Sequence, residues 1–342
     1  LYPGQTPECE VHHGEAVYIT TGSFLPKGAN TIVAVEATKR ITSGQIEVRT
    51  KINPYEHVIY RGSDIERGHS VFRKGHMLRA QDLSILATLR IKKINVVKKP
   101  IVAIICVGDE LTDTIDEAPA GKIVNSLRHV VTAMIHELGG ESLYLGIASD
   151  QVTEIQDKIE EGIIRADMVL LIGGSSMGNK DATSEAVDSM GNPGVIIHGI
   201  KRKPGRVSGF AVVKNKPVVL LPGLCHSLVV GFYTFAFPIL LAMNGLSYAD
   251  SQLRLRAKIT QQISFTRFIP FEQVTFVNVK RTREGYRADP CIGESSSFSV
   301  LARANAFTIT PPRKGLVKAG EEVRVHLLPS FFSLNDLFTI MS

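Results

Sequence analysis

The most constraining feature of this chain is an alternation of strand and helix patterns that begins at residue 101. The segment IVAIICV, at 101–107, is a continuous apolar run, which is typical of a strand buried on both faces of a parallel sheet. A helical pattern then begins at Asn125 and stops at Gly139, because glycine readily ends a helix. This alternation predicts a parallel sheet with right-handed helical crossovers.

The same rhythm continues to about residue 246. Three more apolar strand patterns, ESLYLGI, DMVLLIGG and PVVLLPG, alternate with helices that we expect near 151–164, 182–190 and 227–243. We therefore assign residues 99–246 to an α/β domain. The predicted fold class is α/β plus all-β, in a multidomain chain whose parallel-sheet domain is flanked by β-rich domains.

The flanking regions have a different pattern. Residues 1–62 carry short alternating segments, AVYIT, TIVAVEA, QIEVRT and HVIYR, broken by glycine and proline, which predicts a small β-rich domain. Residues 63–98 read as a connector or partial N-terminal domain with a helix at 79–90. Residues 247–342 return to alternation, and we expect a C-terminal small β-barrel-like domain there.

Composition excludes several classes of protein. Hydrophobic residues make up 44% of the 342 and charged residues 21%, and we see no apolar run of the roughly 18 residues that a membrane span needs. The four cysteines are widely spaced, which argues against a disulfide framework or a four-thiolate zinc site and favours the cytoplasm. The net charge of +6 is spread along the chain, so it favours a small anionic ligand over nucleic acid.

Carboxylates follow three of the predicted strands. VGDEL places Glu110 after the first strand, LGIASD places Asp150 after the second, and the loop after the third ends at Asp181. Ligands of open parallel sheets bind outside the carboxyl ends of the strands. The three carboxylates would suit a hard cation such as Mg²⁺ that bridges an anionic substrate. The alternative for each, above all Asp181, is that it only caps the following helix.

The third loop, GGSSMGNKD at 173–181, has the parts of an anion cradle. Glycines allow close approach of the backbone, and serines offer amide and hydroxyl donors. Asn179 precedes Lys180, so the loop departs from the phosphate loop of nucleotide triphosphatases. A tight turn without a ligand is the alternative. The candidate binding residues here are Gly173, Gly174, Ser175, Ser176 and Gly178.

Two further loops lie at the same predicted edge. KRKPGR, at 201–206, concentrates four positive charges beside a Pro-Gly turn, and a solvated basic loop is the alternative to an anion site. The last strand runs into PGLCHS at 222–227. Cys225 in that segment lacks a recognisable His-Asp companion pattern, so we expect a small buried filler and not a nucleophile.

These loops, in this order, resemble those of the molybdopterin molybdenumtransferase family, that is MoeA and the gephyrin E domain. The resemblance runs nearly end to end. It is carried by GQTPE, GEAVYITTGSFLPKGAN, GSDI, VGDEL, GKIVNS, LGIASD, GGSSMGNKD, KPGR, LPG, LARANAFTITP and AGEEVRVHLL.

The resemblance implies an elongated four-domain homodimer whose site lies between the molybdopterin-binding domain of one subunit and a β-rich region of the other. It implies insertion of molybdate or tungstate into adenylylated molybdopterin, with Mg²⁺ involved and AMP released. The site carboxylates fall on Glu110, Asp150 and Asp181. A molybdopterin adenylyltransferase is an implied partner. Binding roles fall on the cradle residues and on Lys203, Arg206, Pro222, Ser227 and Thr21, the last reaching the partner's site.

Departures from the family pattern leave alternatives open. Ile172, Ser175 and Met177 replace the family's serine and valines, and Leu224 and Cys225 stand where the family has Asn and Pro. A carrier or scaffold paralogue would keep the pterin site without catalysis. A molybdopterin adenylyltransferase shares the α/β domain, but it lacks the flanking β-domains.

Overall fold

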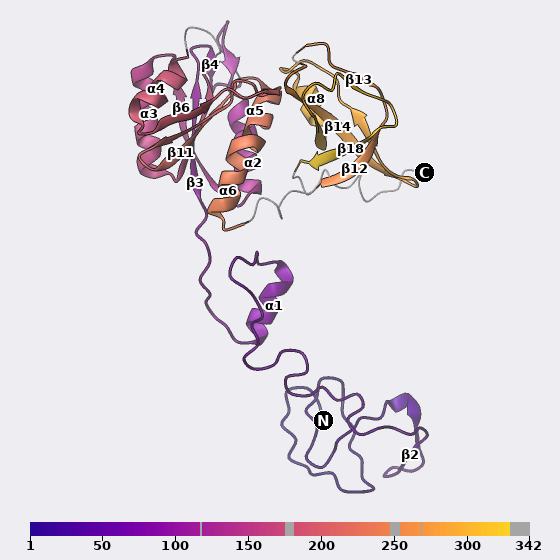
Figure 1. The fold of residues 1–342 in the computed structure, drawn as a ribbon. Coiled ribbons are helices and arrows are strands. Elements are labelled where there is room, and N and C mark those ends of the chain that lie inside the picture. The colour runs from indigo at the N-terminus through magenta and orange to yellow at the C-terminus, as the bar shows by residue number, and fades with distance from the viewer. Residues whose placement is uncertain (117, 175–180, 247–253, 268, 329–342) are drawn as a thin grey trace. The chain divides into compact units, whose positions relative to one another are not determined.

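The computed structural model describes the chain except for residues 117, 175–180, 247–253, 268 and 329–342 (Figure 1). It forms two compact units, Leu1–His76 and Met77–Ser342.

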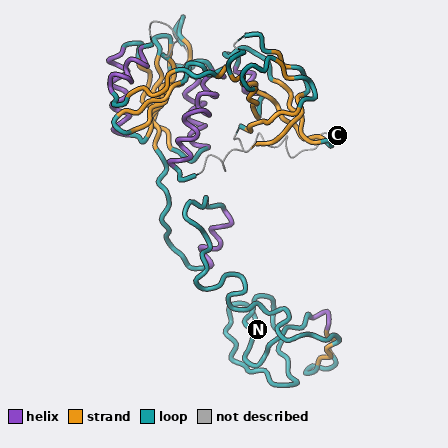
Figure 2. Tube along the Cα trace, viewed as in Figure 1, coloured by secondary structure: helices purple, strands orange, loops and turns teal. Residues whose placement is uncertain are grey.

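The first unit consists mainly of loops and turns (Figure 2). Its regular elements are the 3₁₀ helix η1 at Val35–Ala37 and the antiparallel strands β1 and β2, at Thr38–Arg40 and Ile46–Val48. Residues 1–62 are all described, and of the four strands expected there only QIEVRT overlaps an observed strand. Alternation in sequence is a local signal, whereas a strand also needs a neighbour to pair with. The strand content of residues 1–62 is therefore lower than predicted.

The second unit begins with helix α1 at Ala80–Thr88, inside the helix expected at 79–90. The carboxylate of Asp82, which is buried, accepts from the backbone N–H of Arg79 over 2.8 Å. This bond satisfies one of the N–H groups that a helix start leaves without a helical partner.

The α/β domain is built on a six-stranded sheet in the order β6-β3-β7-β11-β10-β8. Four neighbouring strands are parallel, as predicted: β6 at Glu141–Ala148, β3 at Ile101–Val107, β7 at Met168–Gly173 and β11 at Lys216–Leu221. The sheet is nevertheless mixed, because β10 at Gly209–Val213 runs antiparallel to both β11 and β8 at Gly194–His198. Two short strands, β4 at Leu111–Thr112 and β5 at Ile123–Val124, pair beside it.

Helices cover both faces of this sheet (Figure 1). Val102, Ile104 and Cys106 of β3 pack into the cluster under α2, at Leu127–Glu137, whereas the intervening residues pack under α3 at Val152–Arg165 and α4 at Ala182–Met190. Both faces of β3 are thus removed from water, which is why its apolar run is unbroken. Burial of each large aliphatic side chain contributes about 1.5–3 kcal/mol to folding.

A helix of 19 residues, Cys225–Met243, lies on the α2 face. It comprises α5 at Cys225–Gly231, a π-helical turn η2 at Phe232–Ala236 and α6 at Phe237–Met243. The helix is long and apolar enough to cross a membrane, contrary to our count of apolar runs, but 67% of its most apolar 18-residue stretch is buried inside the protein. We therefore assign it to the core of the α/β domain.

The C-terminal domain is a closed barrel of five strands. Its ring of pairings runs β15-β12-β18-β16-β14 and back to β15, which confirms the predicted barrel-like fold. Its strands are β12 at Arg254–Ile259, β14 at Glu272–Thr282, β15 at Gly285–Pro290, β16 at Ala306–Thr310 and β18 at Glu322–Leu327. A small sheet of β13 at Ile263–Ser264 and β17 at Leu316–Val317, and helix α8 at Phe298–Arg303, complete it.

Candidate functional site

The tips of β3 and β6 bring two aspartates together. The N–H of Asp109 donates to Oδ2 of Asp150, and the N–H of Asp150 donates to Oδ1 of Asp109, each over 3.4 Å. The strands are parallel neighbours, so their carboxyl ends meet at one edge of the sheet. Two exposed carboxylates are therefore held side by side at the predicted edge.

Glu110 lies on the same turn. A side-chain carbon on Gly108 would come within 2.6 Å of Oε2 of Glu110, so this carboxylate folds back over the glycine. The N–H of Ile123 donates to the Glu110 carbonyl over 2.7 Å, and the Lys122 ammonium donates to the Asp109 carbonyl. An ammonium group therefore lies at the backbone of this turn.

The third expected metal ligand, Asp181, has a different environment. It is the N-cap of α4, where its Oδ1 accepts from the N–H of Ser184 over 2.8 Å. Its Oδ2 lies 3.0 Å from Nε2 of His198, at the end of β8. The capping role that the sequence left open is thus present, and both carboxylate oxygens already have partners.

The three carboxylates are not gathered into a ligand set. Across the described part of the chain, no group of three His, Cys, Asp or Glu side chains lies close enough to hold a metal ion. Glu110 and Asp150 still fit Mg²⁺, because this ion commonly takes one or two carboxylates and completes its shell with water and substrate phosphates.

The glycines at the end of β7 are required by packing. A side-chain carbon on Gly173 would lie 2.4 Å from the carbonyl oxygen of Val107, and one on Gly174 would lie 2.2 Å from Oγ1 of Thr183. Both glycines have positive φ angles, so a larger residue would be strained there whatever the space. The turn alone thus explains both glycines. The other cradle residues, Ser175, Ser176 and Gly178, lie outside the described residues.

The basic segment is not a free loop. Arg202–Lys203 forms strand β9, which pairs in parallel with the start of β14 in the C-terminal barrel. Arg202 makes an ion pair of 2.7 Å with Glu272. Lys203 and Arg206 are both half-buried in this segment. One of the four positive charges is therefore already neutralised by the C-terminal domain.

The altered segment PGLCHS connects β11 to α5. A side-chain carbon on Gly223 would lie 3.7 Å from Cα of Gly173, so the loops after β11 and β7 meet. Pro222 and Ser227 are buried in this connection. Pro222 precedes Gly223 in this connection, whereas Ser227 lies in the first turn of α5.

Cys225 and His226 of this segment hold the C-terminal domain. Sγ of Cys225 contacts the carbonyl oxygen of Ser295 at 3.4 Å, and Nε2 of His226 lies 2.9 Å from that of Ser297. Burial lowers the pKa of His226 and raises that of Cys225. Cys225 is 2% exposed, which confirms its prediction as a buried filler.

Asn125, Tyr144 and Asp113 form a polar network that the sequence does not predict. Nδ2 of Asn125 lies 2.9 Å from the hydroxyl of Tyr144 and 3.2 Å from Oδ1 of Asp113. The guanidinium of Arg128 stacks over the Tyr144 ring at 4.7 Å. Burial and the bond to Asp113 raise the pKa of Tyr144. Asn125 belongs to the motif GKIVNS, and the sequence pattern around it indicates a helix start and no polar network.

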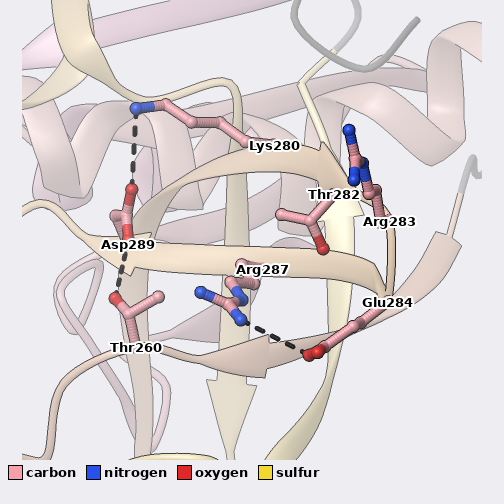
Figure 3. A pocket seen from close by; sticks show the side chains of 7 residues that line it. All are labelled: Thr260, Lys280, Thr282, Arg283, Glu284, Arg287 and Asp289. Atoms are coloured by element: carbon pink, nitrogen blue, oxygen red, sulfur yellow. Dashed lines mark hydrogen bonds and ion pairs between the residues drawn. The ribbon is translucent and has the colours of Figure 1, made fainter. Parts of the chain in front are cut away.

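A surface hollow of about 460 Å³ lies elsewhere on the barrel, along β14, β15 and the turn between them, with Thr260 just after β12 (Figure 3). The charges that line it are partly paired, with Lys280 at 3.7 Å from Asp289 and Arg287 at 3.4 Å from Glu284. None of the predicted site residues lines it. Thr21, the remaining prediction, is exposed in the first unit, in a turn before Gly22.

Comparison with protein families finds three matches along the chain. Residues 2–89 match the MoeA N-terminal region, described as domains I and II, and residues 252–328 match the MoeA C-terminal region, domain IV. Residues 103–242 match a family described as a probable molybdopterin binding domain.

Curated relatives are similar over most of their length. A putative molybdopterin biosynthesis protein of Methanocaldococcus jannaschii is 30% identical over 328 residues, which cover 93% of this chain and 77% of the relative. The molybdopterin molybdenumtransferase of Bacillus subtilis is 28% identical over 95% of this chain and 76% of the relative.

A solved structure of a molybdopterin biosynthesis MoeA protein from Pyrococcus horikoshii superposes with a TM-score of 0.80. It is 29% identical, and the match covers 96% of this chain and 80% of that one.

Proposed function

The chain belongs to the MoeA family of molybdopterin molybdenumtransferases, and on that premise we propose that it inserts molybdate into adenylylated molybdopterin and releases AMP. It is a transferase of molybdenum cofactor biosynthesis, and molybdopterin is its substrate class. The single observation that carries the proposed chemistry is the pair of carboxylate turns at the tips of β3 and β6, where Asp109 and Asp150 meet.

Each group of residues has a distinct role in this proposal. Glu110 and Asp150 would hold Mg²⁺, and the bound ion would supply polarisation of the phosphoanhydride of the adenylylated substrate. Lys203 and Arg206 attract the oxyanion or phosphate charge. The backbone at Gly173 and Gly174, with Ser175, Ser176 and Gly178, binds the phosphate or the pterin, and Pro222 and Ser227 form the adjoining wall.

The assembly is also part of the proposal. We infer a homodimer in which Thr21 reaches the site of the partner subunit, and a molybdopterin adenylyltransferase that supplies the substrate. We place the protein in the cytoplasm because its four cysteines are all free and a reducing compartment preserves thiols.

The test is incubation of the purified chain with adenylylated molybdopterin, molybdate and Mg²⁺, with AMP release as the readout. Glu110→Gln and Asp150→Asn should each lower the Mg²⁺-dependent rate by at least about tenfold, because each removes a charged oxygen ligand. Asp157→Asn, an exposed position on α3, serves as the matched control and should release AMP at the wild-type rate. Normal turnover by both site variants would overturn the metal assignment.

The same assay tests the non-catalytic alternative, which rests on the altered residues Leu224 and Cys225. A protein that binds adenylylated molybdopterin but releases no AMP under any molybdate concentration would be a carrier or scaffold. The matches to MoeA regions on both sides of the α/β domain favour the transferase over this reading and over an adenylyltransferase.

A further inference from the structure

The basic segment of the α/β domain is an added strand on the C-terminal barrel. Arg202 and Lys203 lie opposite Glu272 and Gln273 in a parallel pairing, and the N–H of Glu272 donates to the carbonyl of Lys201 over 2.9 Å. The barrel itself closes through the pairing of β14 with β15. This sixth strand therefore couples two domains at the segment proposed to attract the anion.

Arg202 is held from two sides. Its Nε and Nη2 both lie 2.7 Å from Oε2 of Glu272, and its Nη1 donates to Oγ1 of Thr234 over 2.9 Å. The hydroxyl of Thr234 donates in turn to the carbonyl of Val230 over 2.6 Å. Because these side chains are 24% and 36% exposed for Arg202 and Glu272, the pair is partly shielded from water. Charge-assisted bonds of this kind are stronger than neutral ones.

Thr234 occupies the π-helical turn η2. An extra residue in a helical turn shifts the register of the side chains that follow, and such turns occur frequently at functional sites. Here the irregular turn carries the hydroxyl that meets the Arg202 guanidinium. The long helix of the core and strand β14 of the barrel thus hold the same arginine.

The bonds that hold Arg202 also fix the directions in which the neighbouring side chains point. Successive side chains of a strand point to opposite sides, so fixing Arg202 toward Glu272 directs Lys203 to the other side. The turn that follows is equally constrained, since the N–H of Ile200 donates to the carbonyl of Arg206 over 2.8 Å. A side-chain carbon on Gly205 would lie 2.9 Å from Val230. The turn therefore has little freedom to reorient by itself.

We propose that Glu272 is a positioning residue for the anion site. It acts through Arg202, and its role is to hold the basic segment so that Lys203 and Arg206 face molybdate. The C-terminal barrel is then required for oxyanion binding even though Glu272 itself does not touch the anion. This inference rests on the proposed function of the basic segment.

The test is calorimetric titration of the full chain with molybdate, together with hydrogen exchange of the amides in 200–208. Glu272→Gln should raise the Kd for molybdate about fivefold, a loss consistent with one partly exposed charged hydrogen bond, and should speed exchange in 200–208. The control is Glu322→Gln, which removes the 3.0 Å ion pair with Arg256 on the same barrel. The control should leave both measurements within about twofold of the wild type.

A charge reversal separates positioning from general damage. Arg202→Glu alone should weaken molybdate binding by about tenfold or more, whereas the double variant with Glu272→Arg should recover most of that loss, because paired residues show non-additive effects. Equal molybdate affinity in the wild type and Glu272→Gln, or no recovery in the double variant, would overturn the positioning role while the anion site stands. A wild-type chain that binds no molybdate would overturn the proposed function, and the positioning role with it.

Discussion

The side chain of Asp181 caps a helix and could also act in catalysis, and substitutions of this residue can separate the two roles. Its Oδ1 caps α4 through the N–H of Ser184, at 2.8 Å, and its Oδ2 lies 3.0 Å from His198. Asparagine caps helices about as well as aspartate, whereas alanine removes the acceptor. We expect Asp181→Ala to lower the free energy of unfolding by about 1 kcal/mol. Asp181→Asn should stay within about 0.5 kcal/mol of the wild type.

The activity of Asp181→Asn tests whether the negative charge of Asp181 acts in turnover. Asp181→Asn keeps the cap but removes the negative charge that faces His198. If the charge acts in turnover, AMP release should fall by at least about tenfold in Asp181→Asn, at nearly wild-type stability. If the rate is unchanged, the cap is the whole role of this residue and only Glu110 and Asp150 remain as metal ligands.

Stability is measured by urea unfolding followed by circular dichroism, and activity by AMP release at saturating molybdate. Asp157→Asn, exposed on α3, controls for the loss of one negative charge from the domain. The argument from the cap would be refuted if Asp181→Asn were as unstable as Asp181→Ala. In that case the contact with His198, and not the cap, would carry the stabilisation.

Three further outcomes can be checked directly. Gly174→Ala should destabilise the protein by at least about 2 kcal/mol in urea unfolding, since its new carbon would lie 2.2 Å from Oγ1 of Thr183. A loss of less than about 0.5 kcal/mol, the size of a neutral surface change, would contradict this prediction. Burial and nearby arginines lower the pKa of His326 to about 4, so the unfolded state binds more protons between about pH 4 and 6.5. Unfolding free energy should therefore rise with pH across that window and level off above it, and His326→Gln should flatten the rise. Burial raises the pKa of Cys106 to about 12, so a thiol reagent at neutral pH should label Cys9, which is exposed, and leave Cys106 unmodified in the folded protein.

The α/β core was predictable because its signals are local. Burial on both faces makes a strand continuously apolar, and a helix on a sheet shows a 3.6-residue period. Helices α3 and α4 begin and end within about one or two residues of the positions expected, the usual uncertainty of such boundaries. The antiparallel strands β8 and β10 were missed because each has only five residues, and a short apolar run does not by itself distinguish a strand from a buried helix segment.

The strands of the first unit were less predictable because strand pairing is not a local property of the sequence. Its segments alternate like strands, but alternation says only that one side of a segment is apolar. Many of its large apolar side chains are exposed, for example Tyr18 at 70% and Ile59 at 89%. Without a paired neighbour the pattern does not become a strand.

For the candidate site, the sequence indicated which residue types are present and at which edge of the sheet they lie. It did not indicate which side chains bond to one another. Glu110 and Asp150 could be placed because each follows a strand directly, and parallel strands share one edge. For Asp181 the sequence left a cap and a metal ligand as equal alternatives, and only the distances to Ser184 and His198 show that the cap is made. His198 itself carried no signal, since one histidine at a strand end has no pattern around it.

What the sequence by itself determined is the order of the domains, the buried parallel strands and the loops that follow them. These follow from the periodicity of neighbouring residues and from turn chemistry, which act over a few positions. Only the tertiary structure decided that Arg202 pairs with Glu272, 70 residues away. The same is true of the contacts of Cys225 and His226 with the backbone carbonyls of Ser295 and Ser297. Such pairs form because whole domains pack together, and packing between distant segments leaves no periodic trace in either one.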